Sequence, residues 1–244
     1  MCIFVYCLVS YKARVANDYM RVLVACEYSG KVRDAFIKLG HDAISCDILP
    51  TDNPGPHYQG DVFNIINDGF DMMIAFPPCT YLTNAGIRWF NVDRYGAKAI
   101  KRHENRLEAM EFVSKLYNSR IDKICIENPI GYLNKNFRSP DQIVHPYFFG
   151  DSHVKPTCLF LKNLPLLVRH KGTVKPEPLL IQQRRPGKYY KGGEEKKHYF
   201  TGAFLRDSHS RSKTFQGIAD AMASQWGTSN VNPIQQTLFK ALTY

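Results

Sequence analysis

A cysteine in a proline-rich turn is the residue of this chain best suited to nucleophilic chemistry. Cys79 follows Pro77 and Pro78, which in turn follow the apolar run 72–76. Such a run predicts a buried strand of a parallel sheet, and open α/β sheets gather their ligands at the carboxyl ends of these strands. Because proline has a fixed φ and no N–H, the turn is stiff. The sequence therefore predicts a rigidly presented thiol, although a cysteine after a strand is often only core packing.

Acidic and polar residues follow three other predicted strands. They are Glu27–Gly30 after the strand 21–26, Asp47 after the strand 43–46, and Glu127–Pro129 after the strand 123–126, with Asp61 nearby in the chain. Because the carboxyl ends of parallel strands meet at one edge of a sheet, these groups are expected to share a crevice with Cys79. Each is weak alone, since a single acidic residue after a strand often only caps a turn or helix. Their combination indicates a site.

The elements that must position these groups alternate along the chain. Strands are predicted at 21–26, 43–46, 71–76, 123–126 and 158–161, and helices at 32–39, 61–66, 104–117 and 215–226. This alternation predicts an α/β fold, a parallel sheet with helices on both faces. The segment 80–103 is long and polar and is predicted to be a loop, of the kind that is usually functional or mobile.

The composition predicts one α/β domain. The chain has 244 residues, 44% of them hydrophobic, which is enough for a full core. Its seven cysteines form no C-x-x-C or zinc-like spacing, so neither a disulfide scaffold nor a bound metal is expected, and the expected location is a reducing cytoplasm. No apolar run approaches the roughly 18 residues of a membrane span. Residues 1–19, before Met20, are expected to be an N-terminal extension, with an edge strand as an equal alternative.

The net charge of +10 is concentrated in one segment. Residues 162–213 hold 13 Lys and Arg against 4 Asp and Glu, a net charge of +9, and so leave +1 for the rest of the chain. The same segment contains five aromatic residues, Tyr189, Tyr190, Tyr199, Phe200 and Phe204. Interleaved basic and aromatic side chains suit phosphate contacts and base stacking. The alternative is a solvated loop with surplus lysines.

The motifs resemble those of the DNA cytosine-5 methyltransferases, and most closely the small phage-associated members that lack a full target-recognition domain. The matching residues are Glu27–Gly30, Gly40–Ala43, Cys46-Asp47, Pro77–Leu82 and Glu127–Pro129, and the resemblance covers roughly residues 20–165. It implies a Rossmann-like S-adenosylmethionine-dependent methyltransferase sheet with a small basic insertion. The implied divisions are an extension at 1–19, a catalytic core at 20–161, a reduced recognition segment at 162–213, and a closing helix and tail at 214–244.

The resemblance also implies roles for single residues. Cys79 would add to carbon 6 of cytosine, Glu127 would protonate or hydrogen-bond N3, Asn128 would position Glu127 or brace the backbone, and Lys155 would lie near the substrate. S-adenosylmethionine would contact Glu27, Tyr28, Ser29, Gly30, Asp47, Asp61 and Pro77. The glycine-rich turn of the family is degraded here, because Cys26, Tyr28 and Ser29 stand where small residues let a donor approach the backbone. No metal is implied.

The implied partner is duplex DNA with a flipped cytosine, bound in the cytoplasm of a bacterial host if the chain is phage-encoded. The expected nucleic-acid-binding residues are Arg88, Arg184, Arg185, Lys188, Arg211 and Lys213. Because only about 50 residues replace the usual recognition domain, low sequence specificity is expected. The loop 80–103 would close over the flipped base.

Two other functions stay open from the sequence. The same scaffold can act on RNA, a free nucleotide or an already modified pyrimidine. A nucleic-acid-binding protein that has lost turnover is the third possibility, which the degraded turn favours and the presence of both Cys79 and Glu127 disfavours.

Overall fold

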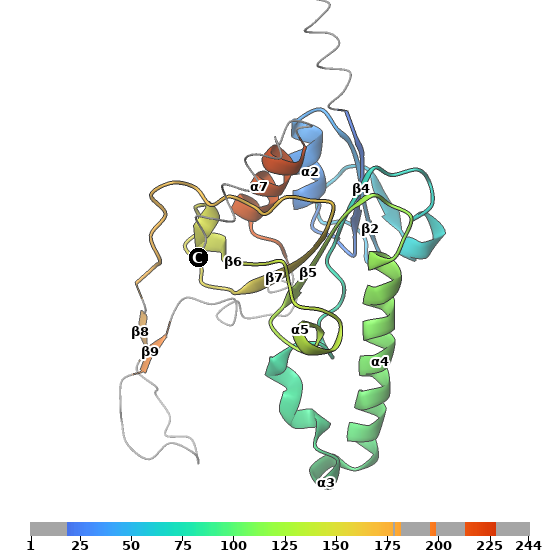
Figure 1. Cartoon of the computed structure of the whole chain (residues 1–244), viewed down its shortest axis with the longest axis vertical. Coiled ribbons are helices and arrows are strands. Elements are labelled where there is room, and N and C mark those ends of the chain that lie inside the picture. The colour runs from blue at the N-terminus through green and yellow to red at the C-terminus, as the bar shows by residue number, and fades with distance from the viewer. Residues whose placement is uncertain (1–18, 178, 182–195, 199–212, 228–244) are drawn as a thin grey trace, which may run out of the picture.

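The fold centres on a seven-stranded sheet, seen in the computed structural model in Figure 1. The structure describes residues 19–177, 179–181, 196–198 and 213–227. The strand order is β3-β2-β1-β4-β5-β7-β6. The strands are β1 (Arg21–Ala25), β2 (Asp42–Asp47), β3 (His57–Gln59), β4 (Met72–Ala75), β5 (Lys123–Pro129), β6 (Gln142–Val144) and β7 (Thr157–Lys162). The order 3-2-1-4-5 is that of a Rossmann-like sheet, so the predicted fold class is confirmed.

The central strands form because they are apolar on both faces. Val22 and Val24 of β1 point into one core, and Leu23 and Ala25 point into the other. In β4 the residues likewise alternate between the two cores, and all four are buried. Continuous apolar runs of this kind are typical of parallel strands that are covered on both sides.

Helices cover both faces of the sheet. Two helices, α2 (Lys31–Lys38) and α7 (Gln216–Trp226), pack against each other and contribute Phe36, Met222 and Trp226 to one core. The other core includes side chains of η1 (Val62–Asn64), α4 (Ala97–Tyr117) and α5 (Leu133–Asn136). Figure 1 shows α2 and α7 together on one side and α4 on the other.

The sheet is not wholly parallel, which corrects the sequence prediction. β7 pairs antiparallel with β5 and with β6, whereas β1 to β5 pair in parallel. Between β5 and β7 the chain forms α5, β6 and η3 (Pro146–Phe149) but no long crossover helix. A parallel strand needs such a crossover, so this connection returns β7 in the opposite direction. Neither β3 nor β6 was among the predicted strands.

The segment 80–103 is helical and is not the predicted loop. It forms η2 (Asn84–Phe90), α3 (Val92–Tyr95) and the first turns of α4, which begins at Ala97 and not at residue 104. At 21 residues α4 is about 31 Å long. Its first turns extend away from the sheet, with α3 at the far end (Figure 1). We call residues 84–106 the arm.

Other predictions fall at the edges of the described chain. Residues 1–18 lie outside it, whereas Met20 is buried in the core beside β1. Much of the basic segment also lies outside; its described parts include β8 (Leu179–Ile181) and β9 (Lys196–His198), an antiparallel pair. Within the described residues, no helix is both long and apolar enough to cross a membrane.

Candidate active site

The turn that carries Cys79 and the end of β5 lie side by side. Strands β4 and β5 pair in parallel with Ala75 opposite Ile126, so Glu127 and Asn128 continue β5 beside the first residues of the Pro77–Cys79 turn. Among the cysteines in the described part of the chain, Cys79 alone is exposed. The structure therefore brings the predicted thiol and the predicted acid to one edge of the sheet.

Asn128 braces the proline turn. Its side chain is fully buried, and its amide Nδ2 donates a hydrogen bond of 3.2 Å to the carbonyl of Pro77. Pro77 and Pro78 have no N–H to donate, and this bond from a buried side chain holds the Pro77 carbonyl in place. Of the two roles implied for Asn128, the geometry shows the backbone brace. Its Oδ1 has no partner among the described residues.

Lys155 and Thr157 both stabilise the ionised form of Glu127. Burial raises the pKa of Glu127, while the charge of Lys155 and a hydrogen bond from Thr157 oppose that shift. Thr157 begins β7 and lies opposite Pro129, so the antiparallel strand delivers both groups to the end of β5. The Lys155 ammonium also lies 5.8 Å from the ring centre of Phe215. Sequence spacing alone would not have paired residue 155 with residue 127.

The thiol of Cys79 responds to the same two charges. Partial burial raises the pKa of Cys79, the Glu127 charge raises it further, and Lys155 lowers it. Cys26, at the next strand end, is a poorer nucleophile, because burial and then Asp47 raise its pKa far above that of a free thiol. Burial thus favours the neutral forms of the Cys79 thiol and the Glu127 carboxyl group, and the charge of Lys155 opposes this at both.

Two arginines of α4 hold the chain just after Cys79, and the sequence analysis missed both. Arg102 donates a 3.0 Å hydrogen bond to the carbonyl of Thr80, and Arg106 donates one of 3.0 Å to the carbonyl of Tyr81. The Arg106 guanidinium also lies 3.2 Å from the ring centre of Phe90. A helix spacing of four places both arginines on one face, which is the only signal that the sequence offered.

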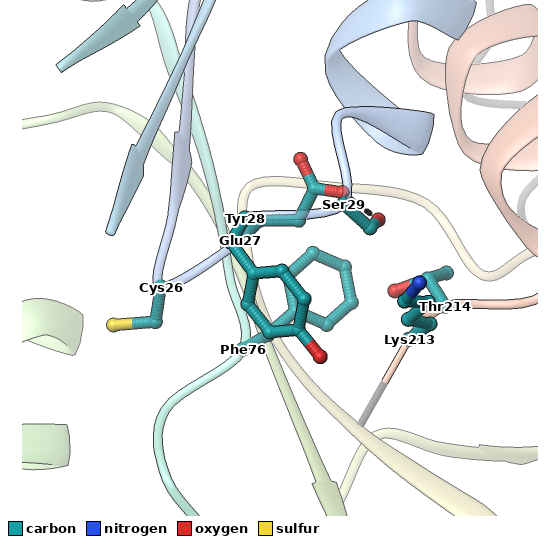
Figure 2. A pocket seen from close by; sticks show the side chains of 7 residues that line it. All are labelled: Cys26, Glu27, Tyr28, Ser29, Phe76, Lys213 and Thr214. Atoms are coloured by element: carbon teal, nitrogen blue, oxygen red, sulfur yellow. Dashed lines mark hydrogen bonds between the residues drawn. The ribbon is translucent and has the colours of Figure 1, made fainter. Parts of the chain in front are cut away.

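A small pocket lies at the end of β1, beside β4. It is lined by Cys26, Glu27, Tyr28, Ser29, Phe76, Lys213 and Thr214 (Figure 2). Its volume of about 50 Å³ is room for a small charged group and is well below the roughly 300–1,000 Å³ of sites that enclose a whole small molecule. In Figure 2 the Cys26 sulfur points away from the other labelled side chains. Of the predicted donor residues, Glu27, Tyr28 and Ser29 line this pocket.

Glu27 is a buried acid with one unused oxygen. Its Oε1 accepts a short hydrogen bond from the Ser29 hydroxyl and a 3.0 Å bond from the backbone N–H of Lys31. Its Oε2 has no partner among the described residues, although the side chain is only 4% exposed. Burial raises the pKa of Glu27, and the two hydrogen bonds oppose that shift. An unpaired buried carboxylate oxygen suits a cationic ligand group.

Gly30 has its own steric reason to be glycine. It has a φ of 74° at the N-terminus of α2, and a Cβ there would lie 2.5 Å from Nη2 of Arg33. Arg33 is fully buried, and its guanidinium donates to the carbonyls of Asn53, Pro54 and Pro56. The turn that the family fills with glycines is therefore shaped here around a buried arginine and the loop after β2.

Asp47 and Asp61 lie near this pocket and do not line it. Asp47 ends β2 and accepts a 2.9 Å bond from the N–H of Leu49, and Asp61 caps η1 through a 3.0 Å bond from the N–H of Phe63. Both carboxylates are close enough to raise the pKa of Cys26. Their ribose and adenine contacts stay predictions, as does the donor contact of Pro77.

Lys213 and Thr214 close the pocket from the other end of the chain. The Lys213 ammonium forms a 2.8 Å ion pair with Asp52, and the Lys31 ammonium donates a 3.1 Å bond to the carbonyl of Thr214. Lys213 was expected to bind nucleic acid; the structure places it at the rim of the pocket. Thr214 and Phe76 were not among the predicted donor residues.

The other predicted nucleic-acid contacts are divided between the arm and the undescribed segment. Arg88 lies exposed in η2, with its guanidinium 4.7 Å from the ring centre of Trp89. Arg184, Arg185, Lys188 and Arg211 lie outside the described residues. In the part of the chain that is described, no group of three or more His, Cys, Asp and Glu side chains could hold a metal ion.

Comparisons with known proteins found partial structural likeness to methyltransferases. No family model and no curated protein matches the chain. The methyltransferase EhMeth of Entamoeba histolytica aligns over 63% of this chain and 57% of its own, at 14% identity and a TM-score of 0.43. The Dnmt2 methyltransferase of S. pombe aligns over 64% and 52%, at 16% identity and a TM-score of 0.38. The chain thus spans little more than half the length of either protein.

Proposed function

We propose that this protein transfers a methyl group from S-adenosylmethionine to carbon 5 of cytosine in DNA, with Cys79 as the nucleophile. The supporting observation is the pairing of an exposed thiol with a half-buried acid at the ends of adjacent parallel strands, β4 and β5. Asn128 fixes the thiol turn through Pro77, and Lys155 influences both groups. Addition to a pyrimidine ring is a reaction that needs a thiolate and a proton donor at one site.

The proposed chemistry needs Cys79 as a thiolate and Glu127 as a protonated acid. The Cys79 thiolate adds to carbon 6 of cytosine, which makes carbon 5 electron-rich. Glu127, whose pKa is raised by burial, can donate its proton to N3 and so neutralise the charge that develops on the ring. Carbon 5 would then bond the methyl group as the bond from that group to the donor sulfur breaks. Loss of the carbon 5 proton to solvent, expulsion of the thiolate and return of the N3 proton to Glu127 would restore the aromatic ring.

Lys155 has the charge that the thiolate needs. The ammonium lowers the pKa of Cys79 and so opposes both burial and the Glu127 charge. Protonation of Glu127 removes the repulsion that it exerts on the thiolate. A proton that sits on Glu127 therefore favours ionisation of Cys79, which is the combination that the addition step requires.

The pocket beside β1 suits the charged end of a cationic methyl donor. Glu27, Tyr28 and Phe76 line it, Oε2 of Glu27 has no partner among the described residues, and a carboxylate and aromatic rings are groups that attract an ammonium or sulfonium. When bound, S-adenosylmethionine supplies an electrophilic methyl group. Glu27, Ser29, Lys213 and Thr214 are the residues that would hold its charged end.

DNA as the polymer substrate is supported by charge and not by a described interface. The segment 162–213 has a net charge of +9, and the arm adds the exposed Arg88. A cytosine in duplex DNA must leave the stack to reach Cys79, so base flipping is part of the proposal. Because the recognition segment is short, we propose low sequence specificity.

Labelled S-adenosylmethionine tests the proposal when it is offered with duplex DNA, single-stranded DNA, RNA and dCMP in turn. Transfer to DNA that is lost in Cys79→Ala and kept in the neighbouring Thr80→Ala supports it. Transfer only to RNA or dCMP would indicate a different pyrimidine substrate. Binding to DNA without transfer to any acceptor would indicate a protein that has lost turnover.

The covalent step has a separate test. DNA that contains 5-fluorocytosine should form a stable adduct with the protein, because fluorine cannot leave carbon 5 as a proton does. The adduct should map to Cys79 by peptide mass spectrometry and be absent in Cys79→Ala. Transfer to DNA without any such adduct would contradict the proposed covalent route.

A further inference from the structure

The arm is a second basic and aromatic region, separate from the segment 162–213. Residues 84–106 include six Lys and Arg against Asp93 and Glu104, a net charge of +4. The net charge of +1 for all residues outside 162–213 does not reveal this cluster, because acidic residues elsewhere in the chain offset it. A positive patch on a projecting element is an electrostatic footprint for a polyanion.

The tip of the arm presents neighbouring aromatic and guanidinium groups. The guanidinium of Arg88 lies 4.7 Å from the ring centre of Trp89, whose ring lies 4.9 Å from that of Tyr95. The guanidinium of Arg94 lies 5.4 Å from the ring centre of Tyr95. Trp89 is 43% exposed, so the tip keeps a large ring in water and not in the core. A burial role therefore does not account for the indole.

The arm holds these groups in place before any ligand arrives. Asn91 caps α3 through a 2.7 Å bond from the backbone N–H of Arg94, and the carbonyl of Phe90 pairs with His103 at 3.0 Å. Phe90 is buried beneath the guanidinium groups of Arg102 and Arg106. A preorganised platform loses little conformational entropy when a flat ligand stacks on it.

We propose that this platform binds unpaired bases of a single-stranded polynucleotide, DNA or RNA, with Trp89 and Tyr95 stacking on bases and Arg88 and Arg94 contacting phosphates. Aromatic rings offer any base a stacking surface, and the base must be unpaired to use it. The net positive charge favours this ligand over a protein with an apolar face, although Ile87 and Val92 are also exposed. That the bound strand contains the target cytosine rests on the proposed function; the binding itself does not.

Tryptophan fluorescence gives a direct readout, because the chain has only two tryptophans, Trp89 and Trp226. Trp226 is 3% exposed and bonded to the carbonyl of Pro165, so it is shielded. Titration of Cys79→Ala protein, without methyl donor, with single-stranded DNA or RNA 20-mers should quench Trp89 emission and protect it from iodide. A blunt duplex of the same sequence should do neither. Trp89→Phe should lose the signal yet keep the affinity.

Affinities from fluorescence anisotropy complete the test. Trp89→Ala should weaken single-strand binding by about 5- to 150-fold, and the matched Tyr19→Ala should not. Arg88→Glu with Arg94→Glu should weaken it further and reduce its salt dependence, whereas Arg120→Glu should not. Circular dichroism confirms that each variant is folded. The DNA and RNA titrations decide which strand is preferred.

Several results would overturn the inference. Unchanged single-strand affinity in both arm variants, or equal losses for single strand and duplex, would contradict a stacking platform. Self-association that depends on Ile87 and Val92, without any nucleic-acid effect, would make the tip an interface between copies of this chain. If the unmodified arm binds no single strand while methyl transfer is intact, this inference alone is refuted. If the arm binds single strands and no acceptor is methylated, the proposed function alone is refuted.

Discussion

At the residue scale, Cys79 is held between two opposite charges. Glu127 raises the pKa of the thiol after burial has already done so, and Lys155 lowers it. The same two residues interact with each other, since Lys155 lowers the pKa that burial raises at Glu127. The three groups therefore titrate as a coupled set, and a change at one is measurable at another.

Removing the Glu127 charge should make Cys79 ionise at lower pH. In Glu127→Gln the negative charge that raises the pKa of Cys79 is gone, so that pKa should fall. Iodoacetamide should therefore alkylate Cys79 at a lower pH than in the wild type. Lys155→Met removes the charge that lowers the pKa of Cys79 and should move alkylation to higher pH. The rate at Cys79 is followed by peptide mass spectrometry from pH 6 to 10.

A matched substitution separates this effect from a general one. Glu108→Gln removes an exposed carboxylate of α4 and should leave the alkylation profile unchanged. Identical profiles for Glu127→Gln and the wild type would mean that the two groups are not coupled, and the proposed acid–nucleophile pair would then lose its electrostatic basis.

Asn128 should contribute to stability as well as to geometry. Asn128→Ala leaves the Pro77 carbonyl without its buried partner and opens a small cavity, so the free energy of unfolding should fall by about 1–3 kcal/mol. Urea unfolding measures the change, with the exposed Asn67→Ala as the control. A loss below a few tenths of a kcal/mol would show that the turn keeps its shape without the bond.

At the scale of elements, the sequence predicted what burial determines. The strands β1, β4 and β5 were found because their apolar runs are unbroken, and α2 and α7 because their apolar residues have helical spacing. The arm was not found, because its helices lack an apolar stripe that faces a core. Leu107, an apolar residue of α4, is 56% exposed. The arm is ordered by arginine contacts, which hydrophobic periodicity does not detect.

The arginine contacts of α4 should be needed for activity more than for folding. Arg106→Ala removes the hydrogen bond to the Tyr81 carbonyl and the stack on Phe90, so the residues after Cys79 should become mobile. We expect kcat to fall by up to about 10²-fold, since small misplacements of a nucleophile are costly. Hydrogen exchange at residues 80–83 should accelerate, while Arg120→Ala should change neither quantity. Normal exchange there, with normal kcat, would refute the role.

At the scale of the whole molecule, the site is assembled from segments that are distant in sequence. Cys79 and Glu127 could be predicted together, because parallel strands end at one edge. Lys155 was placed near the substrate by resemblance alone, and its electrostatic link to both Cys79 and Glu127 depends on the reversal of β7. Thr214 lines the pocket beside β1 because α7, which follows it in the chain, packs against α2. Such contacts follow from tertiary packing, which no local pattern encodes.

Glu27, the buried acid of the pocket beside β1, should lower the free energy of unfolding at neutral pH. Burial raises the pKa of Glu27 above that of the unfolded chain, so the folded state binds its proton more tightly. The free energy of unfolding should therefore rise as the pH falls from 7 toward about 4.5, by about 1.4 kcal/mol for each unit of pKa difference. In Glu27→Gln the side-chain carbonyl can still accept the hydrogen bond from Ser29, and the contribution of residue 27 to the pH dependence of unfolding is removed.

Urea unfolding of Glu27→Gln and wild type between pH 4.5 and 8 measures the effect. The variant should be more stable at pH 7, and its advantage should shrink as the pH falls, while the exposed Glu108→Gln should follow the wild type. The variant should also bind S-adenosylmethionine more weakly, because the proposed site uses the Glu27 carboxylate to hold the charged end of that donor. A variant that is less stable at pH 7 would show that the hydrogen bonds from Ser29 and Lys31 outweigh the burial of charge, and the acid would then be structural.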